Sequence, residues 1–372
     1  MTEGDSIAPG GIVGILGGGQ LGRMIAMAAA RLGFKVHIYC PEEEAPARQV
    51  AYQWTVGAYE DIPRLEAFAE ATDVVTYEFE NIPAETAKLL AKKTLVRPHP
   101  AALEIAQDRE LERKFLTKIG VPVSPYQSVS TRQELDRAID AVSLPAVLKT
   151  RRGGYDGKGQ AVIRKKEDAD AAWEAVKAVP SILEKFVPFR KEISVIIARG
   201  QDGQYAAFDP SENVHRDHIL HQSLVPCDEP ESTLVAAQQH AIRIAEALDY
   251  VGIMAIEMFV LEDGALDPLM INEIAPRVHN SGHWTIDACH VSQFEQHIRA
   301  ICGWPLGTSA RHSDALMQNL IGDEVLEWRT LMAKPQFCLH LYGKNPPRPG
   351  RKMGHYTRLL PLGTSRSQII SD

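Results

Sequence analysis

A lysine followed by a glycine-rich segment suits the chemistry of a polyphosphate. Lys149 ends the apolar run at residues 145–148, and residues 151–160 (RRGGYDGKGQ) follow it closely. An ammonium group at the end of an apolar strand is costly unless it meets an anion. Backbone N–H groups of glycines and the Lys158 ammonium both suit phosphate oxygens. The segment therefore predicts a mobile lid over phosphates, with a solvated surface hairpin as the alternative.

Two carboxylates lie within apolar stretches that are typical of buried strands. Glu257 lies within residues 253–259 (IMAIEMF), and Glu273 lies within residues 271–274 (INEI). Carboxylates in such surroundings are rarely buried unless they pair with a cation or bind a metal. On adjacent strands they would hold one or two Mg²⁺ ions that bridge nucleotide phosphates. Half-exposed strand acids without a metal are the alternative.

Residues 275–285 (APRVHNSGHWT) follow the second carboxylate and are dense in hydrogen-bond donors, which predicts an anion or substrate contact. Residues 181–187 (SILEKFV) combine an apolar strand with Glu184, and Glu192 follows. An apolar slot suits adenine and a carboxylate suits a ribose, although an edge strand with an exposed glutamate is equally compatible. We expect no metal site at His215, His218 and His221, because no strand or helix geometry is assured there.

A second glycine-rich segment lies near the N-terminus. Residues 17–22 (GGGQLG) have the spacing of a dinucleotide fingerprint and lie between an apolar strand at 12–16 and an alanine-rich helix at 23–32. Such glycines let the backbone approach an anion, and the helix N-terminus adds partial positive charge. The acidic residues 42–44 (EEE) lie about 20 residues further on, which superficially supports NAD, but the glycine motif alone is compatible with any phosphate. A tight turn without any ligand is the alternative.

Alternating strands and helices position this first turn. Strands are expected at 12–16, 34–39 and 73–77, with helices at 23–32 and 62–71, and this alternation indicates a parallel, Rossmann-like sheet.

Residues 95–100, which contain two prolines, are expected to be a connector. Asp108 is expected to cap a helix whose Leu111, Phe115 and Ile119 share one face. The elements expected after it are strands and a glycine-rich loop at 144–192, a helix at 232–248, and strands at 253–260 and 270–274.

Length, charge and composition limit the classes of function. The 372 residues predict two or three domains, and 45% hydrophobic with 24% charged residues is ordinary for a globular protein. A net charge of −8 argues against a general nucleic-acid or anionic-membrane binder. Residues 344–372 nevertheless carry a local charge of +5. Such a basic segment suits the phosphate of a small ligand.

Several absences favour a cytoplasmic protein. The chain has no apolar run of about 18 residues that would span a membrane, and no basic segment followed by an apolar stretch marks a signal peptide. The five cysteines are far apart, odd in number and without a CxxC pair. Reduced thiols without a zinc site are therefore expected.

The order of these features resembles the ATP-grasp superfamily and, within it, the 5-(carboxyamino)imidazole ribonucleotide synthase family of purine biosynthesis. The segments that carry the resemblance cover nearly the whole chain: 17–24 (GGGQLGRM), 77–82 (YEFENI), 154–160 (GYDGKGQ), 272–277 (NEIAPR), 279–285 (HNSGHWT) and 351–355 (RKMGH). Two positions depart from the family, Val278 where proline is usual and His218 where glycine is common. We expect Val278 to soften the substrate loop slightly and neither change to remove a functional group.

The resemblance implies a fold of mixed α/β and α+β class in three parts. These are a Rossmann-like domain at 1–105, an ATP-grasp domain at 106–303 with a mobile lid at about 144–192, and a small β-rich C-terminal domain at 304–372. It implies a homodimeric ATP-dependent ligase. Its substrates would be ATP, bicarbonate and 5-aminoimidazole ribonucleotide, and its metal would be Mg²⁺. Nucleic acid and membrane would not be partners.

The resemblance also implies a role for individual residues. Those expected to hold ATP are Arg109, Lys149, Gly154, Tyr155, Asp156, Gly157, Lys158, Gly159, Gln160, Glu184, Lys185, Phe186, Val187, Glu192, His215, Asn272 and Glu273. Glu257 and Glu273 would carry Mg²⁺. The expected catalytic groups are Tyr155, Asp156, Lys158, Arg277 and His279. The ribonucleotide would contact Gly19, Gln20, Leu21, Glu80, Asn280, Ser281, Lys344, Arg351 and Lys352. Its phosphate would bind at Gly19 to Leu21 together with Arg351 and Lys352, so the first glycine turn would be a phosphate site but not one for NAD.

Other classes of function remain open at this point. A NAD-dependent oxidoreductase would explain the first glycine turn but not residues 149–160 or Glu273. A non-catalytic nucleotide-binding regulator would bind ATP without turnover. Within the superfamily, a formate-using glycinamide ribonucleotide formyltransferase or a biotin carboxylase shares the same use of ATP.

Overall fold

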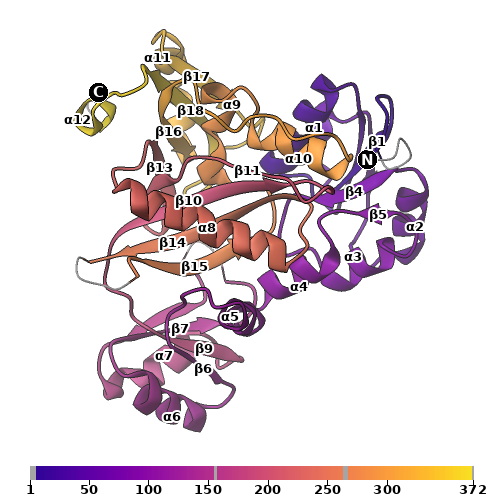
Figure 1. Cartoon of the computed structure of the whole chain (residues 1–372). Coiled ribbons are helices and arrows are strands. Elements are labelled where there is room, and N and C mark those ends of the chain that lie inside the picture. The colour runs from indigo at the N-terminus through magenta and orange to yellow at the C-terminus, as the bar shows by residue number, and fades with distance from the viewer. Residues whose placement is uncertain (1–5, 155–156, 263–266, 371–372) are drawn as a thin grey trace.

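The computed structural model describes residues 6–154, 157–262 and 267–370, which form three sheets with helices packed around them (Figure 1). The first sheet is parallel and five-stranded, in the order β3-β2-β1-β4-β5. Its strands are β1 (Ile12–Leu16), β2 (Lys35–Cys40), β3 (Gln53–Val56), β4 (Val74–Tyr77) and β5 (Leu95–Val96). The helices of this part are α1 (Gln20–Arg31), α2 (Ile62–Glu70), α3 (Ala84–Leu90) and α4 (Pro100–Gln107).

This N-terminal part has the predicted Rossmann-like alternation of strands and helices. Val13, Ile15 and Leu16 of β1 are fully buried, as expected for a parallel sheet with both faces covered. Helix α1 begins at Gln20, three residues before its predicted start. Leu21, Ile25 and Ala29 of α1 are buried at four-residue spacing, which is the stripe that an amphipathic helix presents to a core.

The second sheet is small and antiparallel. Its four strands, in the order β6-β9-β7-β8, are β6 (Tyr126–Val129), β7 (Ala146–Thr150), β8 (Gln160–Ile163) and β9 (Ser181–Lys185). Helices α6 (Arg132–Val142) and α7 (Ala169–Ala175) pack on it through a shared apolar core. Figure 1 shows this unit projecting from the rest of the molecule, with β7 and β9 at its centre.

The largest sheet is antiparallel and continues into the C-terminal part. Its path is β15-β14-β10-β12-β13-β16-β18-β17, with β11 paired to β10. The strands are β10 (Phe189–Arg199), β11 (Tyr205–Ala207), β12 (Ser211–Arg216), β13 (Ile219–Val225), β14 (Gly252–Leu261), β15 (Leu269–Ala275), β16 (Asp314–Ile321), β17 (Phe337–Leu341) and β18 (Lys352–Leu360). The accompanying helices are α8 (Glu231–Ala247), α9 (Thr285–Ala288), α10 (Gln293–Ile301), α11 (Trp328–Met332) and α12 (Arg366–Ile370). The predicted β-rich C-terminal part is thus an extension of this sheet through the β13–β16 pairing.

Helix α5 (Arg109–Lys118) lies between the small and large sheets (Figure 1). The predicted cap is confirmed, because the Asp108 carboxylate accepts a hydrogen bond from the Glu110 N–H at 3.0 Å. The predicted buried face is only partly correct. Phe115 and Ile119 pack on the core, but the fully buried positions are Glu112, Arg113 and Leu116, while Leu111 stays half-exposed. A charged pair therefore occupies the place expected for an apolar side chain.

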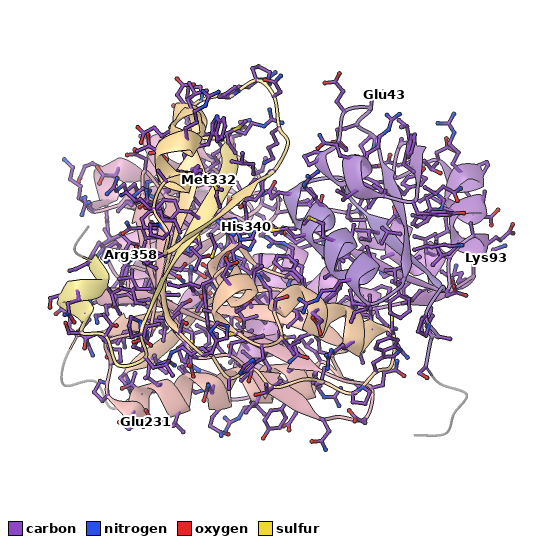
Figure 2. The ribbon with its side chains drawn as sticks, turned by 90° about the horizontal axis from the view of Figure 1, so that it is seen from above. Glu43, Lys93, Glu231, Met332, His340 and Arg358 are labelled. Carbon is purple, nitrogen blue, oxygen red and sulfur yellow. The ribbon has the colours of Figure 1, made fainter. Side chains whose placement is uncertain are left out.

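The N-terminal part is joined to the large sheet through a common core. Apolar side chains of α1 and α10 belong to one buried cluster, and the Thr76 hydroxyl contacts His297 Nε2 at 2.8 Å. In the view from above, the N-terminal part with Glu43 and Lys93 lies on one side and the C-terminal elements with Met332 and Arg358 lie on the other (Figure 2). None of the helices in the described residues has the length and apolar character needed to cross a membrane.

Candidate active site

A cleft of about 760 Å³ lies where the three sheets meet, and most of the predicted site residues line it. Those lining it are Gly19, Gln20, Leu21, Glu80, Arg109, Lys149, Gly154, Gly157, Lys158, Gln160, Glu184, Lys185, Phe186, Val187, Glu192, His215, Glu257, Asn272, Glu273, Arg277, His279, Asn280 and Lys352. Tyr155 and Asp156 lie outside the described residues. Predicted site residues from all three parts of the fold therefore lie in one cavity.

Lys149 and Glu184 face each other on neighbouring strands of the small sheet. The Lys149 Nζ atom lies 2.6 Å from Glu184 Oε2, and both side chains are largely buried. Burial by itself raises the pKa of Glu184, but the cations of Arg113, Lys149 and Arg109 outweigh it and hold this pKa below its usual value. Burial lowers the pKa of Lys149 although Glu184 opposes the shift. The pair places a desolvated ammonium at the edge of the cleft, where an anion would lower its cost.

Helix α5 contributes a charged pair that links both walls of the cleft. Arg113 Nε donates to Glu184 Oε1 at 2.6 Å, Nη1 to Glu112 Oε2 at 2.8 Å and Nη2 to the Asn272 carbonyl at 2.5 Å. Glu112 Oε1 in turn accepts from the Ile274 N–H at 2.7 Å. The backbone on either side of Glu273 is thus held by two adjacent residues of one helix.

Sequence reasoning named Arg109 on this helix but missed Glu112 and Arg113. A signal was present, because positions three and four residues after Arg109 lie on the same helical face. That face also carries the buried Leu116, so a charged pair on it had to be partnered.

Glu257 and Glu273 lie directly opposite each other on β14 and β15. Glu257 Oε1 is 3.0 Å from His279 Nε2, and Glu273 Oε2 is 3.5 Å from Arg109 Nη1. Burial raises the pKa of Glu257, but the hydrogen bond and charge of His279 outweigh it and lower this pKa overall. Among the described residues no three His, Cys, Asp or Glu side chains are clustered for a metal. Two opposed carboxylates facing a cleft still fit a Mg²⁺ ion that takes its other ligands from water and phosphate.

His279 is held by buried groups that the sequence did not reveal. The Gln293 side chain accepts from the His279 N–H at 2.9 Å and donates to its carbonyl at 2.7 Å. The His279 Nδ1 atom contacts the Ser281 hydroxyl at 2.8 Å, and that hydroxyl lies 2.6 Å from Ser194 Oγ. Ser281 is therefore buried behind His279 and does not line the cleft.

The opposite end of the cleft carries the groups predicted for the ribonucleotide. Arg277 and Glu80 form an ion pair. Burial raises the pKa of Glu80, but Arg277 outweighs it and lowers this pKa overall. Lys352 lines the cleft, whereas Lys344 lies behind it and donates to the Lys352 carbonyl at 2.8 Å. Arg351 does not line the cleft, and its guanidinium contacts the Pro346 carbonyl at 3.3 Å.

Two further contacts involve His215 and the predicted lid. His215 Nδ1 lies 3.4 Å from Glu192 Oε2; burial lowers the pKa of His215, but Glu192 outweighs it and raises this pKa overall. Gly157 of the lid lies against His218, since a Cβ at Gly157 would come within 2.6 Å of the His218 side chain. His218 has a φ of +64°, a conformation that favours glycine, so this departure is accommodated at a strained turn. Gly159 packs on Thr150 and does not line the cleft.

Three family descriptions match consecutive parts of the chain. Residues 11–107 match the ribonucleotide synthetase preATP-grasp domain, residues 114–294 the ATP-grasp domain, and residues 315–367 the phosphoribosylaminoimidazole carboxylase C-terminal domain. Together they span all three sheets.

Whole-chain relatives have the same description. An N5-carboxyaminoimidazole ribonucleotide synthase from Brucella melitensis is 50% identical over 96% of this chain and 98% of its own length. One from Bacillus subtilis is 42% identical over 94% of this chain and 92% of its own. Among solved structures, the ADP complex of such a synthetase has a TM-score of 0.92 at 43% identity, covering 96% of this chain and 94% of that one. The Aspergillus clavatus synthase, solved with ADP and 5-aminoimidazole ribonucleotide, has a TM-score of 0.88 at 31% identity, covering 95% and 94%.

Proposed function

The chain belongs to the N5-carboxyaminoimidazole ribonucleotide synthase family of ATP-grasp ligases, and from this we infer how its cleft is used. The protein catalyses the ATP-dependent carboxylation of 5-aminoimidazole ribonucleotide by bicarbonate in purine biosynthesis, with release of ADP and phosphate. One observation supports placing the reaction in this cleft. A single cavity is lined by the Lys149 ammonium, the opposed carboxylates of Glu257 and Glu273, and the basic C-terminal residue Lys352.

The chemistry needs positioning more than a protein nucleophile. Bicarbonate is a poor electrophile, so we propose that one of its oxygens first attacks the γ-phosphorus of ATP, breaking the bond to ADP and forming carboxyphosphate. The exocyclic amine of the ribonucleotide then attacks the carboxyl carbon, inorganic phosphate leaves, and the amine loses a proton. The protein's task is to align the three reactants and to neutralise their charge.

The small sheet and its lid are proposed to hold ATP. Lys149 and Arg109 supply positive charge to the phosphates, and Gly154, Gly157 and Gln160 border the same space with backbone N–H groups beside Lys158. Phe186 and Val187 offer apolar surface to adenine at the same end of the cleft. The carboxylate of Glu184 already pairs with Lys149 and Arg113, so it acts on ATP by orienting Lys149.

Glu257 and Glu273 would hold Mg²⁺, with Asn272 beside them. When bound, this ion neutralises phosphate charge and polarises the transferred group. His279 orients the Glu257 carboxylate, and Arg109 does the same for Glu273.

Arg277, His279 and Asn280 are proposed to shape the bicarbonate and amine sites, with Glu80 near the aminoimidazole. Lys352, supported by Lys344 and Arg351, provides positive charge for the ribonucleotide phosphate, and Gln20 and Leu21 border the same space. The catalytic roles of Tyr155 and Asp156 stay proposals based on the family pattern.

Two wider properties are also proposed. The five cysteines are free thiols, which suits a reducing cytoplasm. A homodimer is proposed from the family resemblance, and sedimentation of the purified protein would test it.

The reaction itself can be tested by leaving out one reactant at a time. ADP release should require both bicarbonate and 5-aminoimidazole ribonucleotide, because bicarbonate accepts the phosphoryl group of ATP and the ribonucleotide amine accepts the carboxyl group of the resulting carboxyphosphate. Formate in place of bicarbonate should not support turnover. ADP release with glycinamide ribonucleotide and formate would instead indicate a formyltransferase. Release with bicarbonate and biotin would indicate a biotin carboxylase.

Lys344 predicts a pH dependence of ribonucleotide use. Burial, with the nearby cations of Arg351 and Lys352, lowers the pKa of Lys344 to about 8, so its charge is present below this pH and lost above it. The kcat/KM for the ribonucleotide should therefore fall above about pH 8, while the KM for ATP changes little. The matched control is Lys344→Arg, which stays charged and should remove the fall. An unchanged alkaline fall in that variant would contradict the role of Lys344.

A further inference from the structure

The glycine turn between β1 and α1 is filled by a side chain of the protein itself. Glu78 follows β4, and its carboxylate accepts hydrogen bonds from the N–H groups of Gly19 and Gly22, the latter at 2.5 Å. Glu78 is only 7% exposed. A phosphate bound by such a turn would use these same N–H groups at the start of the helix.

The glycines of the turn make room for this carboxylate. A Cβ on Gly17 would overlap Glu78 Cγ, one on Gly19 would lie 2.7 Å from Glu78 Oε1, and one on Gly22 would lie 3.3 Å from Glu78 Cδ. Gly17 also has a φ of +107°, but Gly19 has a φ of −77° that any residue adopts. At Gly19, therefore, the close approach of Glu78 is what excludes a side chain. The spacing that predicts a phosphate turn here serves an internal anion.

The surrounding charges agree with this arrangement. Burial raises the pKa of Glu78 overall, but the N–H groups of Gly22 and Gly19 at the positive end of α1 and the cations of Arg277 and Lys344 oppose this shift and favour the charged carboxylate. A second anion in the turn would meet the negative charge of Glu78 at close range. On the C-terminal side, Lys352 lines the cleft and offers positive charge to the substrate's phosphate, with Lys344 behind it donating to the Lys352 carbonyl.

We propose that Glu78 is a built-in anion that occupies the phosphate position of the glycine turn. It excludes a dinucleotide pyrophosphate from the turn and directs the single phosphate of the substrate towards Lys352, which Lys344 supports from behind. This explains why a segment with the dinucleotide spacing occurs in a protein that does not use NAD chemistry. The direction of the substrate's phosphate rests on the proposed function, whereas the occupation of the turn does not.

The exclusion is tested by titrating inorganic pyrophosphate into the ADP-saturated enzyme at pH 7.5, with binding measured by calorimetry. Glu78→Gln keeps the size of the side chain but removes its charge, so pyrophosphate should bind about tenfold more tightly than to the wild type. The gain should persist in a Lys344→Met background because it arises at the glycine turn. Glu70→Gln, at an exposed position of α2, is the matched control and should change nothing. Unchanged or weaker binding to Glu78→Gln, or a gain that disappears with Lys344→Met, would overturn the proposal.

The occupation is tested by a double-mutant cycle on thermal unfolding, which needs no substrate. Gly19→Ala should lower the Tm clearly in the wild type but little in a Glu78→Ala background, because the shorter side chain removes the clash. Additive effects would mean that Glu78 does not occupy the turn, whatever the enzyme's substrate is. If the two substitutions are coupled but Glu78→Gln does not bind pyrophosphate more tightly, Glu78 occupies the turn without excluding pyrophosphate, and the exclusion is wrong. Neither measurement depends on the enzyme's substrate, so both can be interpreted even if the substrate-omission experiment contradicts the proposed function.

Discussion

Replacing Glu273 with glutamine should reduce ATP-dependent ADP formation by at least about 10²–10³-fold, the loss typical when one charge-stabilising group is removed from a preorganised site. Glu273 lies opposite Glu257 on the neighbouring strand, so the substitution removes half of the negative charge proposed to hold Mg²⁺. The glutamine keeps the shape of the side chain and the backbone contacts made by Glu112 and Arg113. The loss should therefore reflect charge and not a collapsed strand.

Binding measurements separate the metal role from a general defect. In the wild type, Mg²⁺ should tighten ATP binding measured by calorimetry, and in Glu273→Gln this effect should largely disappear. Glu231→Gln is a suitable control, because Glu231 is an exposed carboxylate at the start of α8 on the outer surface (Figure 2). Turnover by Glu273→Gln at saturating Mg²⁺ would contradict the assignment.

The sequence predicted best those elements whose information is local. The strand at Ile12–Leu16 and the cap at Asp108 depend on periodicity and on a side chain bonding to its own helix, and both are confirmed. The cleft also contains most of the predicted site residues, because the motifs were specific enough to identify the family. What the motifs did not reveal is that the C-terminal strands continue the large sheet, a pairing between β13 and β16 that no local pattern encodes.

The groups that sequence reasoning missed all act through a distant partner. Gln293 holds the backbone of His279, which is 14 residues earlier in the chain. Glu78 contacts glycines more than 50 residues away, so the segment 77–82 that contains it gave no sign of this role. Lys344, Arg351, Ser281 and Gly159 show the opposite case, because the family resemblance placed them at the site while in this structure they do not line the cleft. Motifs identify which residues belong to a site, and the fold decides which of them face it.

Arg113 belongs to none of the sequence motifs, yet its contacts link both sides of the cleft. Its guanidinium is almost completely buried and donates to Glu184 on the small sheet, to Glu112 on its own helix and to the Asn272 carbonyl on the large sheet. It therefore joins the Lys149 side of the cleft to the Glu273 side.

Removing one partner of a buried ion pair typically costs about 3–5 kcal/mol, because the charge left behind is uncompensated. Arg113→Met should lower the free energy of unfolding by about that amount and also raise the KM for ATP, since Lys149 and Glu273 lose their common support.

Lys114→Met is the matched control, because Lys114 is the next residue on α5 and pairs with Glu110 at an exposed position. Such a surface pair contributes about 0.3–0.5 kcal/mol, so this variant should be nearly as stable as the wild type in urea unfolding.

The loss of unfolding free energy in Arg113→Met should also be smaller at pH 6 than at pH 8. Burial raises the pKa of Glu112 to about 7, and Arg113 opposes this shift, so without Arg113 the carboxyl is protonated at pH 6 and its buried charge is a cost only at higher pH. Arg113→Met with wild-type stability and KM would show that the two walls of the cleft are held together without it.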